Sequence, residues 1–355
     1  MIKLKFVKRT HNNLRWRILS FFIALVSSLL VSGLLMASVG QNAFEAFWAL
    51  FEGAFMGQEA IMDTLLRATP LIFTGLATVV AFRARIWSIG QEGQLVMGAI
   101  FAYGASVIFS GLPSIVLIPL VIIAGFMGGA LLGGFCGWLK YRFKVDEVIS
   151  TVMLNYIVGY FLTYLLSGPW RSKGSYYLQT EEVVKHALYP VLMEEYQLHI
   201  GFLVAIVTTV FMYFLIRKTS LGYDIKALGM NPTAFRYKGA NIPKMFVLVM
   251  MISGGVAALA GTGELLGVHG RLNMDISLGL GFTGIIVAMI GGLTSIGTFF
   301  AAFLFGGLVN GGYVMQVMTG VPLSMVYATQ AIILLFFLCS SLLSKYRIKK
   351  VTDND

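Results

Sequence analysis

Long apolar runs dominate the chain, separated by short polar segments. A membrane-spanning helix needs about 20 mostly apolar residues, because roughly 30 Å of hydrocarbon is crossed at about 1.5 Å per residue. Three of the runs are weak: 64–82 contains Arg67, 90–110 contains Glu92, and 276–293 is short and rich in glycine. The pattern predicts an all-α polytopic membrane protein with about ten transmembrane helices, at residues 18–39, 64–82, 90–110, 114–138, 147–167, 199–216, 245–266, 276–293, 297–318 and 323–343.

Composition agrees with this class. The 355 residues are 57% hydrophobic and 12% charged, with a mean hydropathy of +0.82, whereas a soluble domain carries about 25% charged residues. This hydrophobicity excludes a disordered chain. The formal charge of +10 is too sparse, and too interrupted by apolar runs, for a nucleic-acid-binding surface. Cys136 and Cys339 lie in apolar runs and the four histidines share no ligand spacing, so we expect no disulfide and no metal site.

Lysine and arginine define the expected orientation, because they are enriched in short cytoplasmic loops. With ten alternating spans and the N-terminus inside, 21 of the 26 basic residues fall on the cytoplasmic side. The apolar run 18–39 is longer than the core of a signal peptide, so it is interpreted as a retained first helix. We therefore expect both termini in the cytoplasm.

Two long loops divide one transmembrane domain that covers residues 1–355. The predicted first half, 18–167, is followed by an external loop at 168–198; a cytoplasmic loop at 217–244 precedes the second half, 245–343. In each half a glycine-containing span leads into a polar, glycine-bearing break, at 83–93 or 267–281, and three more spans follow. Because the two halves would run in opposite directions, they form a possible inverted repeat, a common arrangement in transporters.

Glycines recur every four residues along the span 114–138, at Gly125, Gly129, Gly133 and Gly137. Such a ridge of small residues lets another helix backbone approach closely. It favours tight packing within the chain, and a dimer face is the alternative.

Two polar clusters lie where lipid would be expected. Gln91, Glu92 and Gln94 follow Gly90 at the start of a span, and Glu147, Thr151 and Asn155 are spaced by four on one helical face. Polar groups at membrane depth face protein or a water-filled cavity. Both clusters are candidates to line a solute pathway. A structural network at the helix start is the alternative for the first.

The cytoplasmic loop predicts two short amphipathic helices. Gly222 and Gly229 flank the first, Asn231-Pro232 begins the second, and Gly239 ends it. Such helices can dock a partner protein. No Gly-Lys-Ser or Gly-Lys-Thr occurs anywhere, so the chain has no Walker A element of its own. Active transport would then use either an ion gradient or a partner.

This loop resembles the coupling loop of ABC-importer permeases of the branched-chain amino acid/ribose type. Residues 253–261 are similar to a Ser-Gly-x-x-Ala-x-x-Ala-Gly helix of that family, while 89–94 and 147–156 resemble its nucleoside and simple-sugar branch. Ser88 departs from the asparagine that is usual there, and Phe235 from a small residue. The coupling-loop matches are Gly222, Ala227, Gly229, Asn231, Pro232, Ala234 and Gly239.

The resemblance implies a type II-like permease fold in a bacterial plasma membrane. It implies a subunit, not an enzyme, that imports nucleosides by alternating access with a cytoplasmic ABC ATPase, which binds ATP and Mg²⁺. A second homologous permease would complete a heterodimer, and an external solute-binding lipoprotein or periplasmic protein would deliver the solute. The alternatives are a simple-sugar importer, a gradient-driven secondary transporter with Glu92 as its ion site, and a passive channel or scaffold.

Overall fold

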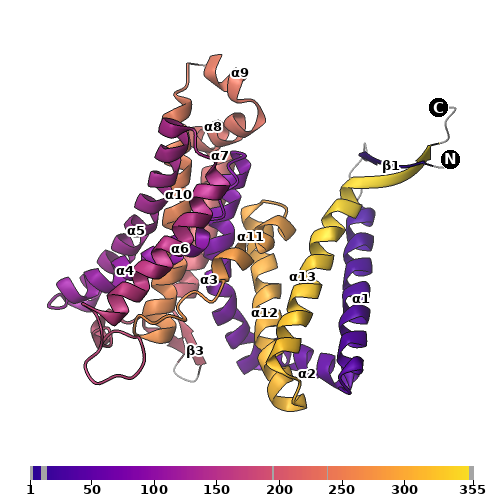
Figure 1. Cartoon of the computed structure of the whole chain (residues 1–355), viewed down its shortest axis with the longest axis horizontal. Coiled ribbons are helices and arrows are strands. Elements are labelled where there is room, and N and C mark those ends of the chain that lie inside the picture. Colours follow the sequence, from indigo (N-terminus) through magenta and orange to yellow (C-terminus); the bar gives the residue numbers. More distant parts are fainter. Residues whose placement is uncertain (1–2, 9–13, 194–195, 238, 352–355) are drawn as a thin grey trace. The chain divides into compact units, whose positions relative to one another are not determined.

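The computed structural model describes residues 3–8, 14–193, 196–237 and 239–351, and these are mostly helical (Figure 1). Two short strand pairs, β1 (Lys3–Lys8) with β4 (Tyr346–Val351) and β2 (Val191–Met193) with β3 (Tyr196–His199), accompany the helices. The helices are α1 (Leu14–Ser38), α2 (Ala43–Phe55), α3 (Gln58–Arg83), α4 (Gln91–Ile108), α5 (Ser114–Phe143), α6 (Glu147–Ser167), α7 (Gly201–Lys218), α8 (Ser220–Met230), α9 (Pro232–Tyr237), α10 (Ile242–Gly263, continued by a π-helical segment Glu264–His269), α11 (Leu280–Ile290), α12 (Ser295–Thr319) and α13 (Leu323–Lys345).

The expected all-α membrane fold is confirmed. Each of the ten predicted runs coincides with a helix, and eight helices in the described residues are long and apolar enough to cross a membrane. The other two fall short for physical reasons: α4 begins with Gln91, Glu92 and Gln94, and α11 has only 11 residues. Helix α2 was not predicted, because its 13 residues are too few to span a bilayer.

The chain forms two compact units. Unit 1 comprises residues 1–60 and 308–355, and unit 2 comprises residues 61–307. In unit 1, α1 runs beside α13, where the rings of Phe21 and Phe337 lie 4.8 Å apart (Figure 1). The Asn310 side-chain amide donates to the carbonyl oxygen of Gly53 at 2.9 Å. This buried polar side chain of α12 therefore serves helix packing.

Helix α10 is the centre of unit 2, because α3, α4 and α5 all pack against it. Its Ser253 hydroxyl donates to the carbonyl oxygen of Ala77 in α3 at 2.8 Å. A Cβ atom added at Gly98 of α4 would lie 2.3 Å from the carbonyl oxygen of Ala258. The four ridge glycines of α5 all face α10: Cβ atoms there would lie 2.1 Å from Thr262 Oγ1 (Gly125), 2.3 Å from Gly254 O (Gly129), 2.2 Å from Met250 O (Gly133) and 2.9 Å from Val247 Cα (Gly137).

We expect Gly129→Ala to destabilise the permease by at least about 1–3 kcal/mol, because the added methyl must push two backbones apart. Gly159→Ala in α6 is the matched control, since no neighbouring atom of the described residues lies within 4 Å of a Cβ atom at that position. The measurement is the thermal unfolding midpoint of each purified variant in the same detergent. Equal midpoints for the two variants would contradict the packing argument.

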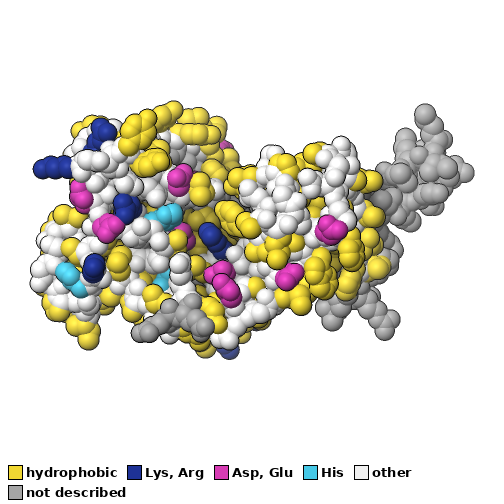
Figure 2. Space-filling view, turned by 90° about the horizontal axis from the view of Figure 1, so that it is seen from below, with side chains coloured by type: hydrophobic (Ala, Val, Ile, Leu, Met, Phe, Trp, Pro, Cys, Tyr) yellow, Lys and Arg dark blue, Asp and Glu magenta, His cyan; other side chains and the backbone are white. Residues whose placement is uncertain are grey.

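The two ends of unit 2 differ in charge. Helices α8 and α9 lie at one end and β3 at the opposite end (Figure 1). Basic residues from separate segments meet at the α8–α9 end: Arg83 shares a cavity with Arg217, and Lys140 and Lys144 share another with Arg236. On the opposite face, charged side chains of both signs lie scattered among hydrophobic ones (Figure 2). That the α8–α9 end faces the cytoplasm stays a prediction of the positive-inside rule.

The predicted external loop folds as a small cap at the β3 end. Its backbone pairs with the segment after α10, since Thr180 N–H donates to Leu272 O at 3.0 Å and Val183 N–H to Gly270 O at 2.9 Å. Glu182 forms an ion pair with Arg271. His199 is 2% exposed, and its Nδ1 accepts a hydrogen bond from the N–H of Gly201 at 3.1 Å.

The cap should lose stability in acid. Burial lowers the pKa of the His199 imidazole to about 4, below its ordinary value of 6.5. As the pH falls, the unfolded chain therefore takes up a proton at His199 before the folded chain does. The contribution of His199 to the free energy of unfolding is fully present above pH 6.5 and is lost as the pH drops toward 4. The total loss is on the order of 3 kcal/mol. The loss of stability is measured as the thermal unfolding midpoint between pH 7.5 and pH 4.5. His199→Asn should make this midpoint depend less on pH. The control His186→Asn, at an exposed position, should leave the pH dependence unchanged.

Candidate translocation and coupling site

The first polar break separates α3 from α4 and is held by side chains of α6. The N–H of Ile89 donates to Thr151 Oγ1 at 3.1 Å. Asn155 bonds the break twice: its Nδ2 donates to Ile89 O at 2.8 Å, and its Oδ1 accepts from the N–H of Gly93 at 2.9 Å. The face of α6 that the sequence singled out therefore satisfies backbone groups that the interrupted helix leaves free.

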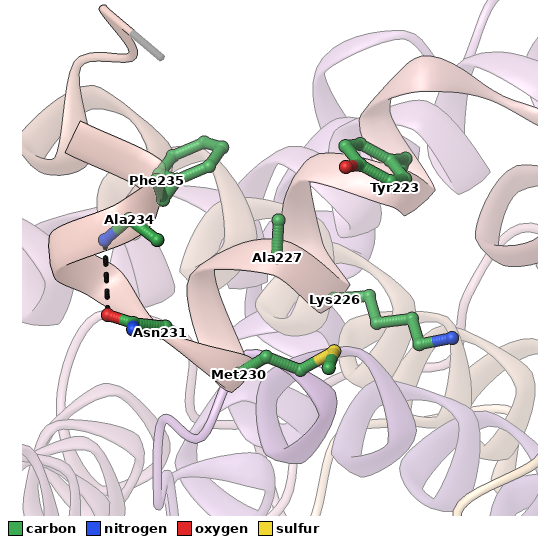
Figure 3. A pocket seen from close by; sticks show the side chains of 7 residues that line it. All are labelled: Tyr223, Lys226, Ala227, Met230, Asn231, Ala234 and Phe235. Atoms are coloured by element: carbon green, nitrogen blue, oxygen red, sulfur yellow. Dashed lines mark hydrogen bonds between the residues drawn. The ribbon is translucent and has the colours of Figure 1, made fainter. Parts of the chain in front are cut away.

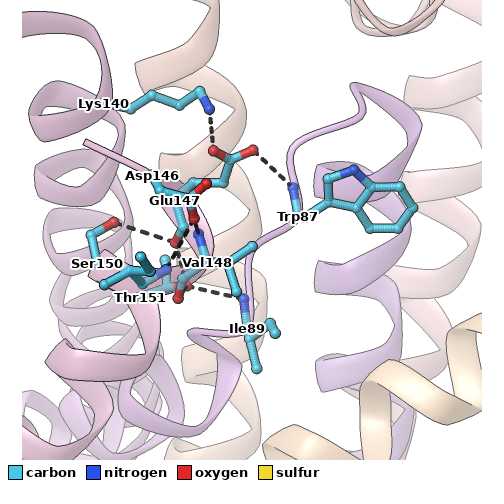
Figure 4. A network of polar contacts seen from close by, with 9 residues as sticks. Trp87, Ile89, Lys140, Asp146, Glu147, Val148, Ser150 and Thr151 are labelled. Atoms are coloured by element: carbon cyan, nitrogen blue, oxygen red, sulfur yellow. Dashed lines mark hydrogen bonds and ion pairs between the residues drawn. The ribbon is translucent and has the colours of Figure 1, made fainter. Parts of the chain in front are cut away.

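Glu147 ties this break to the end of α5. One carboxylate oxygen accepts from the N–H of Trp87 at 3.4 Å, and the other pairs with Lys140 (Figure 4). Asp146 caps α6 by accepting from the N–H of Val148 at 2.8 Å. Lys140, Glu147 and the Trp87 backbone thus form one continuous chain of polar contacts.

The second break, between α10 and α11, meets the first at Glu92. The Glu92 carboxylate accepts from the N–H of Gly279 at 2.9 Å and from the N–H of Gly281 at 2.7 Å. Gly279 precedes α11 in the left-handed conformation, with φ 83°. A carboxylate in the first turn of α4 thus also sits at the start of α11, where two helix N-termini favour negative charge.

Gln91 and Gln94 differ from the other four predicted pathway residues. Both side chains are 0% exposed, and among the residues that the structure describes neither amide has a hydrogen-bond partner for its nitrogen or its oxygen. Leaving a buried polar group unpaired costs about 1–3 kcal/mol. Glu92, Glu147, Thr151 and Asn155 hold the breaks, whereas these two amides are not part of that network.

One polar pair was not predicted as a site. Glu264 and His269 are the first and last residues of the π-helical segment that continues α10, and Glu264 Oε2 lies 3.7 Å from His269 Nε2. In the sequence, Glu264 is an isolated charged residue in the apolar run 245–266. The pairing depends on the wider π-helical turn, and such bulges occur often at functional sites.

Helices α8 and α9 form a groove of about 600 Å³ at the basic end of unit 2 (Figure 3). The Asn231 side chain caps α9, accepting from the N–H of Thr233 at 3.0 Å and of Ala234 at 3.1 Å. The groove is lined by Tyr223, Lys226, Ala227, Met230, Asn231, Ala234 and Phe235.

The remaining coupling-loop residues take other positions. A Cβ atom at Gly229 would lie 2.1 Å from the carbonyl oxygen of Arg83, so α8 packs directly on the end of α3. Gly222 packs equally closely on α7, with Leu215 O at 2.2 Å. Gly239 has φ +80°, and Pro232 begins α9. Of the matched residues, Ala227, Asn231 and Ala234 thus line the groove, and Gly222 and Gly229 make close packing contacts.

These features define a polytopic membrane protein with a broken-helix site and a pair of surface helices at its basic end. The chain belongs to the family described as "Branched-chain amino acid transport system / permease component", whose model matches residues 60–338. This membership confirms the resemblance found in the sequence. The chain is thus a transport subunit, one part of a larger system, and not an enzyme.

Three relatives resemble nearly the whole chain. It is 35% identical over 317 residues to the guanosine ABC transporter permease protein NupP of Bacillus subtilis, with 88% of this chain and 91% of that protein covered. It is 32% identical over 355 residues to the nucleoside ABC transporter permease protein NupB of Lactococcus lactis, covering 96% and 97%. It is 30% identical over 336 residues to the glucose ABC transporter permease protein TsgB13 of Haloferax volcanii, covering 92% and 88%.

Proposed function

We propose that this chain is the permease subunit of an ATP-driven ABC importer for nucleosides. The similarity to NupP and NupB over at least 88% of each chain carries the proposal. The permease would sit in a bacterial plasma membrane with both termini in the cytoplasm. It would work with a cytoplasmic ABC ATPase that binds ATP and Mg²⁺, with a second homologous permease, and with an external solute-binding lipoprotein or periplasmic protein.

The α8–α9 groove is the proposed ATPase docking site. Its exposed residues Tyr223, Lys226 and Met230 can contact a partner, while Gly229 transmits the movement to the end of α3. Because α3 leads directly into the first break, closure of the ATPase would move the break that α6 holds. This is a physical route for alternating access, in which a bistable element is biased by a partner.

Gln91 and Gln94 are the proposed solute contacts. A side-chain amide offers a donor and an acceptor side by side, the arrangement that pairs with the edge of a purine base. The two breaks meet at Glu92, and broken helices that meet near a repeat interface are typical of inverted-repeat transporters. This meeting supports the inverted repeat expected from the sequence.

A simple sugar is the second candidate solute, favoured by the 30% identity to TsgB13. Sugars and nucleosides both carry vicinal hydroxyl groups, but only nucleosides carry a flat base.

The test is uptake of labelled guanosine by vesicles that contain the complete transporter and its binding protein. Excess unlabelled adenosine, uridine, glucose and galactose are added in turn as competitors. We expect uptake to need ATP and to be blocked by nucleosides. Competition by sugars alone would favour the second candidate, and uptake that persists without ATP would overturn the ABC mechanism.

A further inference from the structure

A second cavity at the basic end of unit 2 lies outside the proposed ATPase groove and shares none of its lining residues. It has a volume of about 600 Å³ and lies between the end of α5 and the segment that joins α9 to α10. Its polar lining includes Lys140, Lys144, Arg236 and Asn241, and its apolar wall includes Pro243 and Phe246.

The cavity is strongly cationic. Among the described residues, Lys140 pairs with Glu147, but neither Lys144 nor Arg236 has a carboxylate within ion-pair distance. The neighbouring Asp146 is occupied in capping α6. Helix α10 begins at the cavity, so the positive end of its dipole adds to the two uncompensated charges.

Exposed aromatic side chains place the cavity at the membrane surface. Trp138, Tyr141 and Phe143, on the last two turns of α5, are 45%, 55% and 59% exposed. Such side chains gather where lipid headgroups meet the hydrocarbon. The Phe246 ring, which Lys140 Nζ approaches to 5.7 Å, gives the cavity an apolar side toward the lipid.

We propose that this cavity binds the phosphate of an anionic phospholipid headgroup from the cytoplasmic leaflet. Lys144 and Arg236 contact the phosphate, and Phe246 and Pro243 lie against the glycerol and upper acyl chain. Basic pockets at the cytoplasmic ends of membrane helices suit such headgroups. The proposal rests on the orientation given above and not on the identity of the solute.

A bound headgroup also affects the first break, through Lys140. Lys140 lines the cavity and pairs with Glu147, whose other oxygen accepts from the N–H of Trp87. A phosphate competes with Glu147 for this ammonium group and thereby loosens the contact between α5 and the break.

The experiment measures lipid binding to the purified full-length permease by native mass spectrometry. Phosphatidylglycerol is titrated against phosphatidylcholine for the wild type, for the double variant Lys144→Gln/Arg236→Gln, and for the control Arg142→Gln/Lys218→Gln. The control removes two exposed cations at the same end that do not line the cavity. Lys140 is left intact because it also pairs with Glu147.

We expect the wild type and the control to prefer phosphatidylglycerol, and the double variant to bind it about 30-fold more weakly. Equal binding by all three, or equal loss in the control, would overturn the site. Displacement by millimolar inorganic phosphate would overturn the lipid assignment in favour of a free phosphate. The assay contains neither ATPase nor solute, so its failure is distinct from failure of the proposed import function.

Discussion

Replacing Ala234 by tryptophan should abolish association of the permease with its ATPase and reduce uptake to background. Ala234 is exposed on α9 and lines the α8–α9 groove, so an indole ring there fills the space that a partner would occupy. Because Ala234 is exposed, the permease itself should fold normally. Co-purification of the ATPase with tagged permease, together with ATP-dependent uptake, measures the effect.

Thr233→Trp is the matched control, because Thr233 is exposed on the same helix but does not line the groove. If it removed the ATPase as completely as Ala234→Trp, the groove would not be the docking site.

Gly229→Val separates docking from transmission. The added side chain cannot fit 2.1 Å from the carbonyl oxygen of Arg83, so α8 must move off the end of α3. We expect this variant to retain at least part of the ATPase and to lose uptake. Normal uptake would contradict the route from α8 to the first break.

Glu92→Gln should produce the second large effect. The carboxylate accepts from two backbone N–H groups of the α11 start, and each bond to a charged acceptor contributes about 1.5–3 kcal/mol. Glutamine offers one oxygen and one NH₂, so one N–H loses its acceptor and faces another donor. We expect loss of at least about 2 kcal/mol of stability and of most uptake, measured by thermal unfolding and by vesicle transport.

Glu59→Gln is the control, since Glu59 is exposed in the first turn of α3 and should change either quantity little. The same experiment tests the gradient-driven alternative. If Glu92 were an ion site, collapsing the proton and sodium gradients would stop wild-type uptake; for an ABC importer, uptake continues while ATP is present.

Much of the fold could be predicted because it depends on one-dimensional properties. Each run expected to cross the membrane coincides with a helix, since a bilayer requires long apolar segments with internally satisfied backbones. The spacing of four between Gly125, Gly129, Gly133 and Gly137 indicated a packing surface. That surface faces α10, but nothing in the spacing identified which helix it would meet.

The candidate site could be predicted only in part from the sequence. Glu147, Thr151 and Asn155 were correctly grouped on one helical face, because helical periodicity is local. These side chains bond to the backbone of residues 87–93, about 60 positions earlier in the chain. Only tertiary packing brings the two segments together. The meeting of Glu92 with Gly279 and Gly281 joins residues nearly 190 positions apart.

By itself, the sequence determined the membrane class, the helices and the family, and it predicted the sidedness of the basic residues. These follow from hydropathy, charge and local motifs, each readable in a short window. Only the tertiary structure decided which polar groups are occupied and which are free. Six similar candidates thus divide into four that hold the two breaks and two, Gln91 and Gln94, whose amides find no partner in the described part of the chain. The physical reason is that hydrogen-bond satisfaction is a property of contacts between distant segments.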